Sequence, residues 1–374
     1  MTGKERLTAT LKGDPVDRPA LNLYEIGGFE VDPEDRDDPY NIYNSPSWKE
    51  LLHIAEEQTD VIRMRTPDRI KENPLYNEFF KIEKYEDNNS LFTKTTLKIG
   101  KKELTSLTRR DRELDTIWTL KHLLDSEEDL KLFLTLPDEV FDAKYDVSNL
   151  FEEEKRTGDK GLVMVDTGDP LCEAAGLFSF ENYALTAMTE QDLFHQLLEK
   201  LSKSLYRKTK QVSKEFPGRL WRIYGPEYAT EPYLPPYLFK DYVQKYTGPM
   251  IEEIQKHGGF ARIHSHGKLK NVLDIISDMN VDAIDPIEPP PQGDVELEYV
   301  ADHYGKDIVL FGNVEITDIE NMETAEFEKK TARSIEAGMK AKGFVLLPSS
   351  SPYGRDISEQ TMTNYKTMVR LVKG

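Results

Sequence analysis

Cysteine is nearly absent from this chain, because Cys172 is the only one among 374 residues. A single cysteine cannot form an intrachain disulfide, and zinc modules built from several cysteines are excluded. The simplest expectation is a protein of a reducing compartment.

Long apolar runs and an excess of positive charge are also missing. No segment approaches the roughly eighteen apolar residues of a transmembrane helix, and the first residues are polar where a secretory signal needs an apolar core. We therefore expect a cytoplasmic protein. Lys and Arg number 49 against 68 Asp and Glu, so the net charge is −19. Such a chain repels phosphate groups, and we expect neither nucleic acid nor a membrane surface as partner.

What the chain does contain is a regular alternation of apolar strand patterns and amphipathic helix patterns. Hydrophobic residues make up 38% of the chain, which is enough for a large core. The expected strands are unbroken apolar runs, as in parallel sheets that are buried on both faces. They cover residues 20–26, 59–67, 161–170, 218–227, 259–267, 281–290, 307–315 and 343–351. Expected helices include residues 2–11, 48–57, 193–212, 238–257, 270–279, 295–304 and 324–341.

Eight strand and helix units predict an α/β fold, a (β/α)8 TIM barrel formed by residues 1–374 as one domain. A doubly wound open sheet is the alternative. No G-x-G-x-x-G follows the first expected strand and no G-x-x-x-x-G-K-[ST] occurs, so the usual nucleotide signatures of open sheets are missing.

An insertion near residues 70–155 interrupts this alternation. Two β-rich runs flank Ile99-Gly100-Lys101-Lys102 and predict a hairpin, and residues 126–155 have a helical, acidic pattern. Trp118 and nearby basic residues could line a substrate pocket, or the hairpin could be solvated.

The stretch GFARIHSHG, residues 259–267, is central to the functional interpretation. Alternate residues of a strand point to one side, so His264 and His266 are expected to face the same place. Imidazole pairs suit zinc, copper, iron or nickel. A hydrogen-bonded core pair or a surface pair of histidines is the alternative.

Most expected strands end in polar or ionisable residues. The carboxyl ends of barrel strands meet at one mouth, where barrel enzymes have their active sites, so many of these side chains are expected to converge. Others would only cap helices or turns. The strand-end residues are Tyr24, Glu25, Arg63, Arg65, Asp166, Tyr224, Glu227, His264, His266, Asp285, Glu288, Asn313 and Ser349.

Arg63 and Arg65 share a face of their strand. They could form a clamp for a carboxylate or phosphate, or salt bridges to the abundant carboxylates of the chain.

Several stretches together resemble the uroporphyrinogen decarboxylase superfamily over most of the chain outside the insertion. They are LKGDPVDRP, DTGDPLCEAAGLFSFENYALTAMTEQDLFHQLLEKL, HGGFARIHSHG, DIVLFGNVE and GFVLLPSSSP. That superfamily includes decarboxylases and zinc-dependent methyltransferases that act with corrinoid proteins. The Arg-rich motif and the Asp of the decarboxylases are not recognisable in NLYEIGG and RMRTPD, so the methyltransferase branch is the closer resemblance.

The resemblance implies a metal site on His264, His266 and Glu288, with Ser349 at a position that holds a cysteine in that branch. Two neutral histidines and one carboxylate would leave zinc, or another divalent metal, with a net positive charge and make it a better Lewis acid than thiolate-bound zinc. We therefore expect a methyltransferase of the demethylase type, which passes a methyl group from a small methylated donor, such as a methyl ether, to a corrinoid carried by a separate partner protein.

Further roles follow from strand-end position alone. Tyr224 or Glu227 would protonate the leaving group, and Asp166 or Asn313 would position the substrate. Substrate contacts are expected from Arg63, Arg65, Tyr24 and Ser349.

Two other functions stay open, a metal-free decarboxylase that holds acidic substrate groups with Arg63 or Arg65 and a non-catalytic barrel that binds a small molecule or a partner protein. A homodimer is also possible.

Overall fold

The computed structural model describes residues 1–28, 39–70, 73–112, 116–352, 354 and 356–374. Its largest sheet has eight parallel strands in the order β2-β9-β10-β11-β12-β13-β14-β1, which is the order along the chain closed on itself. The strands are β1 (Ala20–Leu21), β2 (Val61–Arg65), β9 (Gly161–Gly168), β10 (Leu220–Tyr224), β11 (Phe260–His264), β12 (Ala283–Asp285), β13 (Val309–Val314) and β14 (Phe344–Pro348). This order confirms the predicted barrel, and it excludes the doubly wound sheet.

The two outer strands of that order, β1 and β2, are joined through Asp60 and Met64. The Asp60 amide donates to the Leu21 carbonyl at 2.7 Å, and the Met64 amide donates to the Gly28 carbonyl at 2.7 Å. The Asp60 carboxylate also accepts from the Leu21 amide at 2.9 Å. These hydrogen bonds close the sheet between β1 and β2, which are not paired along their length as the other neighbouring strands are.

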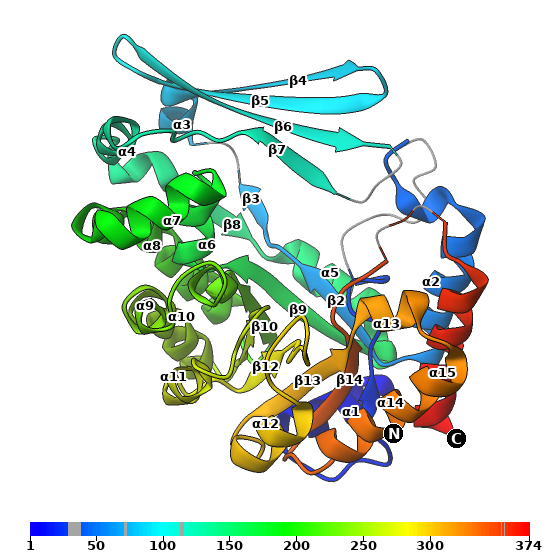
Figure 1. Ribbon diagram of the computed structural model, residues 1–374. Coiled ribbons are helices and arrows are strands. Elements are labelled where there is room, and N and C mark those ends of the chain that lie inside the picture. Colours follow the sequence, from blue (N-terminus) through cyan, green and yellow to red (C-terminus); the bar gives the residue numbers. More distant parts are fainter. Residues whose placement is uncertain (29–38, 71–72, 113–115, 353, 355) are drawn as a thin grey trace.

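Helices surround the strands (Figure 1). They are α2 (Pro46–Gln58), α5 (Ser148–Thr157), α6 (Pro170–Ala175), α7 (Phe180–Thr189), α8 (Gln191–Glu215), α10 (Lys245–Lys256), α11 (Leu273–Asp278), α12 (Leu297–His303), α13 (Ile316–Asn321), α14 (Thr324–Gly338) and α15 (Glu359–Lys373). The helix expected over residues 238–257 begins as α9 (Tyr237–Phe239) and contains one π-helical segment, Lys240–Gln244, before α10. Within the described residues, no helix is both long and apolar enough to cross a membrane.

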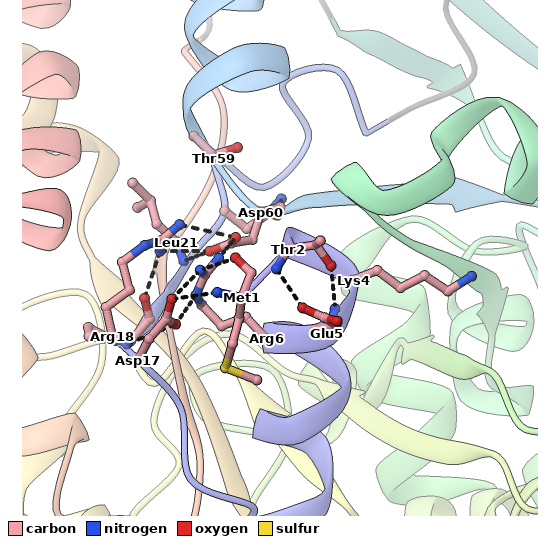
Figure 2. Close-up of polar contacts among 12 residues, drawn as sticks. Met1, Thr2, Lys4, Glu5, Arg6, Asp17, Arg18, Leu21, Thr59 and Asp60 are labelled. Atoms are coloured by element: carbon pink, nitrogen blue, oxygen red, sulfur yellow. Dashed lines mark hydrogen bonds and ion pairs between the residues drawn. The ribbon is translucent and has the colours of Figure 1, made fainter.

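Helix α1 (Gly3–Lys12) closes the end of the barrel at which the strands begin. Thr2 and Glu5 form a capping box at its start, and Leu7 and Leu11 pack onto the apolar floor inside the strands. Arg6 is 4% exposed and binds the carboxylates of Asp17 and Asp60 (Figure 2). The helix is thus held by both apolar packing and a buried ion-pair network.

The insertion forms a second, antiparallel sheet between β2 and β9, at the end of the molecule opposite α1 (Figure 1). Its strands are β4 (Phe80–Asp87), β5 (Ser90–Ile99), β6 (Lys102–Asp111) and β7 (Ile117–Lys121), and β5 and β6 confirm the predicted hairpin. Trp118 on β7 is 46% exposed, which favours the solvated interpretation over a pocket wall.

The helical pattern expected over residues 126–155 is only partly correct. The structure has α4 (Glu127–Leu134), the 3-10 turn Asp138–Phe141, the short strand β8 (Lys144–Asp146) and then α5. Pro137 explains the interruption, since a residue before proline is disfavoured in helical conformation. Strand β8 instead pairs with β3 (Asp68–Ile70), while α3 (Pro74–Phe79) leads into β4.

Candidate functional site

The interior of the barrel changes from apolar to ionisable along the strands. Its apolar floor includes Ala20, Ile62, Met64, Met164, Leu220, Ala283, Val309, Phe311, Val345 and Leu347. Side chains alternate along each strand, so the next inward positions on β9, β10, β11 and β12 are Asp166, Arg222, Arg262, His264 and Asp285. Charged groups thus meet at the carboxyl ends of the strands, as predicted for an active site.

Asp166, Arg222 and Tyr24 form one half of this polar layer. The Arg222 guanidinium donates to both carboxylate oxygens of Asp166, at 2.6 and 3.2 Å, and to the Tyr24 hydroxyl. It also lies against the Tyr24 and Tyr224 rings, 5.5 and 5.3 Å from their centroids. Arg222 is 5% exposed, and these contacts offset the loss of its hydration.

Arg262, Asp285 and His264 form the other half. Asp285 is fully buried and binds the Arg262 Nε at 2.9 Å and the His264 Nδ1 at 2.8 Å. Burial alone would raise the pKa of Asp285, but Arg262 and His264 outweigh it and hold that pKa at about 2. Burial lowers the pKa of His264, which favours a neutral ring. The Tyr24 hydroxyl lies 3.4 Å from the His264 Nε2 and links the two halves.

His266 extends beyond β11 toward the opening of the barrel and is held by Glu288. Its Nδ1 lies 2.8 Å from the Glu288 Oε1, while the Gly267 amide donates to Oε2 at 2.9 Å. Burial opposes protonation of His266, but the hydrogen bond and the charge of Glu288 raise its pKa overall. The same pair lowers the pKa of Glu288 against the effect of burial. Gly267 has a φ of +89°, and a Cβ there would lie 2.9 Å from the Thr230 Oγ1, so this turn requires glycine.

The rings of His264 and His266 lie side by side, with centroids 4.7 Å apart and planes at 87°. This confirms that the two histidines face one place.

Glu227 and Tyr224 are partly exposed at the end of β10. Glu227 accepts a hydrogen bond from the Gly225 amide at 2.9 Å, and its charge contributes to the raised pKa of His266. Glu227 therefore lies close to His266, whereas the Tyr224 ring lies against Arg222 of the polar layer.

Asn313, Glu315 and Ser349 lie at the ends of β13 and β14. Ser349 is 2% exposed, donates to the Glu315 Oε2 at 3.1 Å and accepts from the Ile316 amide at 3.1 Å. Its hydroxyl is already used within the protein, so it holds the backbone and Glu315, and a role in substrate binding is not supported. Burial, then the nearby Glu288, raise the pKa of Glu315 to about 7. The Asn313 Oδ1 is buried and finds no hydrogen-bond partner among the described residues.

Arg63 and Arg65 do not face the barrel interior, which corrects the predicted substrate clamp. They occupy the outward positions of β2, since Ile62 and Met64 are the inward ones. Arg63 pairs with Glu56 at 2.6 Å, and Arg65 pairs with Glu153 of α5 at 2.8 Å. The salt-bridge alternative is the one observed.

The predicted metal ligands His264, His266 and Glu288 do not form a three-ligand group in this arrangement. Among the described residues, no set of three or more His, Cys, Asp or Glu side chains is placed to hold a metal ion. Both Glu288 oxygens are engaged, and Asp285 occupies one nitrogen of His264. Carboxylates behind imidazoles are typical of metal-binding histidines. Here they leave the second ring nitrogen of each histidine, that of His264 lying 3.4 Å from the Tyr24 hydroxyl, and the described residues offer no third ligand beside them. The residues present therefore do not fit the predicted three-ligand site.

The sequence prediction missed Arg222 and Arg262 and gave Asp285 no role. A signal was present, because each arginine stands inside an otherwise apolar strand, LWRIY or FARIH. Each is two residues before a candidate, Tyr224 or His264, and so on the same face of the strand.

The fold and this site define a (β/α)8 barrel with a cluster of ionisable side chains at the carboxyl ends of its strands. The family model described as "Uroporphyrinogen decarboxylase (URO-D)" matches residues 121–373, about two thirds of the chain. The chain therefore belongs to the uroporphyrinogen decarboxylase family, and the resemblance seen in its sequence is confirmed.

A solved structure agrees with the fold. A chain described as "methyltransferase from Methanosarcina mazei" has 14% sequence identity and a TM-score of 0.59, with 99% of this chain and 98% of that one covered. A Bacteroides ovatus xyloglucanase has 8% identity and a TM-score of 0.28, with 83% and 96% covered, which is too low for any conclusion. No curated protein matches the chain significantly.

Proposed function

We propose that this protein is an enzyme, a methyltransferase of the demethylase type, which takes a methyl group from a small methylated donor and passes it to a corrinoid on a separate protein. Membership of the family and the structural likeness to a chain described as a methyltransferase support this class. The observation that carries it is the pair of neighbouring histidines, His264 and His266, each with a carboxylate on its Nδ1.

Breaking a bond between a methyl group and a heteroatom leaves an electron pair on the heteroatom, which then needs a proton. A reduced corrinoid supplies a strong nucleophile for the methyl group. His266 is partly exposed at the opening and is held by Glu288, so its other ring nitrogen is the proton donor in this proposal. His264, neutral and held by Asp285 and Tyr24, lies beside it.

Zinc, or another divalent metal, on His264, His266 and Glu288 stays a prediction of the sequence. Elemental mass spectrometry of untagged protein tests it, with His264→Ala, His266→Ala and Glu288→Ala beside the wild type. Near-stoichiometric metal that disappears in all three variants would confirm the prediction. If metal persists in Glu288→Ala, Glu288 is not a ligand, and its role is to hold the His266 ring in place.

The methyl transfer itself is tested with reduced free cobalamin as acceptor and a panel of methyl ethers as donors, followed by the absorbance change on methylation. We expect turnover by the wild type and a loss of about 100-fold or more in His266→Gln, as for removal of a general acid. His303→Gln is the matched control, because His303 is exposed at the end of α12, and it should keep full activity.

Two other outcomes would replace the proposal. Carbon dioxide release from acidic substrates, undiminished by chelator and without methyl transfer, would indicate a decarboxylase. Arg63 and Arg65 could not act there as predicted, since both bind carboxylates outside the barrel. Ligand binding that survives every single replacement at the site, with no turnover, would indicate a non-catalytic barrel.

A further inference from the structure

A cavity lies outside the barrel, between the inserted segment and helices α6 and α8. Its volume is about 440 Å³, which is within the usual range of small-molecule sites. The inner face of the inserted sheet covers one side through Thr95 and Ser106, and α6 and α8 contribute Glu173 and Lys208 on the other. None of these four residues belongs to the polar layer inside the barrel.

Lys208 is a cation without a carboxylate partner in this cavity. Its Nζ donates to the Thr167 Oγ1 at 3.2 Å and lies 5.8 Å from the centroid of the Tyr145 ring, and no ion pair forms with any described residue. Burial lowers the pKa of Lys208, although Glu173 and Asp166 oppose that shift. The ammonium group has therefore lost hydration that its neighbours replace only in part.

Glu173 is the complementary group on the neighbouring helix. Its side chain takes part in no hydrogen bond or ion pair with the described residues, and its residue surface is open to the cavity. Burial by surrounding atoms raises the pKa of Glu173, and Lys208 counteracts this. Lys208 and Glu173 line the same cavity without a salt bridge between them, so each is available to a ligand.

Aromatic rings and leucine side chains form most of the remaining wall. Tyr76 and Phe80 stack with centroids 4.4 Å apart, and Phe141 packs against Phe80 and Phe133 at 6.4 and 5.6 Å. Rings arranged in this way offer a favourable surface to an apolar or aromatic group. The cavity thus combines two cations, Arg69 over the Tyr76 ring and Lys208, with one anion, Glu173, and an apolar wall.

We propose that this cavity binds a zwitterionic small molecule with an apolar body, of the class of aromatic α-amino acids. The carboxylate of the ligand pairs with Lys208, its ammonium group pairs with Glu173, and its side chain packs on the aromatic wall. Such a ligand gives Lys208 and Glu173 each a partner of opposite charge, with no net change in charge. The proposal does not depend on the reaction at the barrel mouth.

The test is isothermal titration calorimetry of the full chain with L-phenylalanine. 3-Phenylpropionate, which lacks the ammonium group, and phenethylamine, which lacks the carboxylate, are titrated beside it. We expect L-phenylalanine to bind, and each single-charge analogue to bind about tenfold or more weakly, because a charged hydrogen-bonded pair is lost.

Variants separate the two charges. Lys208→Met and Glu173→Gln should each weaken L-phenylalanine binding about tenfold or more. Lys210→Met and Glu181→Gln, exposed positions on α8 and α7, should bind as the wild type does. Ser106→Phe fills the cavity from the sheet side and should abolish binding even if the charge variants fold poorly.

Three results would overturn the proposal. They are no measurable binding of L-phenylalanine by the wild type, equal binding of 3-phenylpropionate, and binding that Ser106→Phe leaves unchanged.

Discussion

Each buried arginine inside the barrel has a carboxylate partner. Arg262 is 1% exposed and Asp285 is fully buried, so neither charge retains contact with water. Placing such charges in a protein interior is expensive, and their mutual attraction repays it only while both are present. The pair therefore supports the position of His264, which shares Asp285.

Asp285→Asn should destabilise the protein by about 3–5 kcal/mol, because it leaves the Arg262 charge buried without its counter-charge. Urea unfolding followed by circular dichroism measures the change. The double variant Arg262→Met/Asp285→Asn is the control. It should be less destabilised than the sum of the two single variants, and simple additivity would show that the pair is not coupled.

Glu315 gives a stability prediction with a defined pH window. Its pKa is about 7 in the folded protein against 4.5 ordinarily. The folded state therefore binds the proton more tightly than the unfolded state, and the free energy of unfolding falls as pH rises from 4.5 to about 7.

Glu315→Gln removes that titration, so the variant should be more stable than the wild type at pH 8 by on the order of 1–3 kcal/mol, an advantage that shrinks toward pH 4. Thermal unfolding across this range measures it. Glu326→Gln changes an exposed glutamate on α14 and should follow the wild-type profile. A constant offset between Glu315→Gln and the wild type at every pH would contradict the assignment.

At the scale of elements, α1 is attached to the barrel by ion pairs through one buried side chain, Arg6. Arg6 joins this helix to Asp60, which holds β1 and β2 together (Figure 2). Arg18 also binds Asp60, at 2.9 Å, so the carboxylate would keep one partner if Arg6 were removed.

Arg6→Met should therefore lower the free energy of unfolding by about 2–3 kcal/mol, somewhat less than breaking an isolated buried pair. Chemical denaturation measures the loss. Lys4→Met is the matched control on the same helix, because the Lys4 side chain is 43% exposed and its Nζ comes no closer than 4.0 Å to the Glu154 carboxylate. The control should change stability by less than about 0.5 kcal/mol, and an equal loss in both variants would argue against the network.

The strands of the barrel could be predicted because parallel strands buried on both faces are continuous apolar runs. The strands β4 and β7 of the insertion lacked this signal. All residues of β7 and all but Phe80 of β4 are exposed, so neither strand has a buried face that would produce a regular pattern.

The sequence predicted that the site lies at the strand ends, but it did not predict which side of each strand faces the barrel interior. A shift of one residue moves every side chain to the other side of a sheet, and the sequence of β2 alone does not say which side is inward. Arg63 and Arg65 were therefore assigned to the mouth although they point to the helices, whereas Arg222 was overlooked although it faces inward. The histidine pair was found because residues two apart in a strand share a face, so its two members were expected on the same side whichever side is inward.

At the scale of the whole molecule, the net charge of −19 dominates. Charges of one sign repel each other in the compact state, and they move apart on unfolding. Salt weakens this repulsion, since the Debye length falls from roughly 30 Å at 0.01 M to about 8 Å at 0.15 M. Salt also weakens exposed ion pairs such as Lys81–Glu83 and Lys98–Glu103.

These two effects of salt oppose each other, and their sizes decide the outcome. An exposed ion pair contributes about 0–1 kcal/mol, whereas the repulsion acts among all surface carboxylates at once. We expect the midpoint of thermal unfolding at pH 7.5 to rise by about 1–2 °C between 10 and 200 mM salt, equivalent to about 1 kcal/mol in a chain of this size. NaCl and KCl should act alike, because screening depends on ionic strength alone. A fall of the midpoint would mean that attractive pairs outweigh the net negative charge.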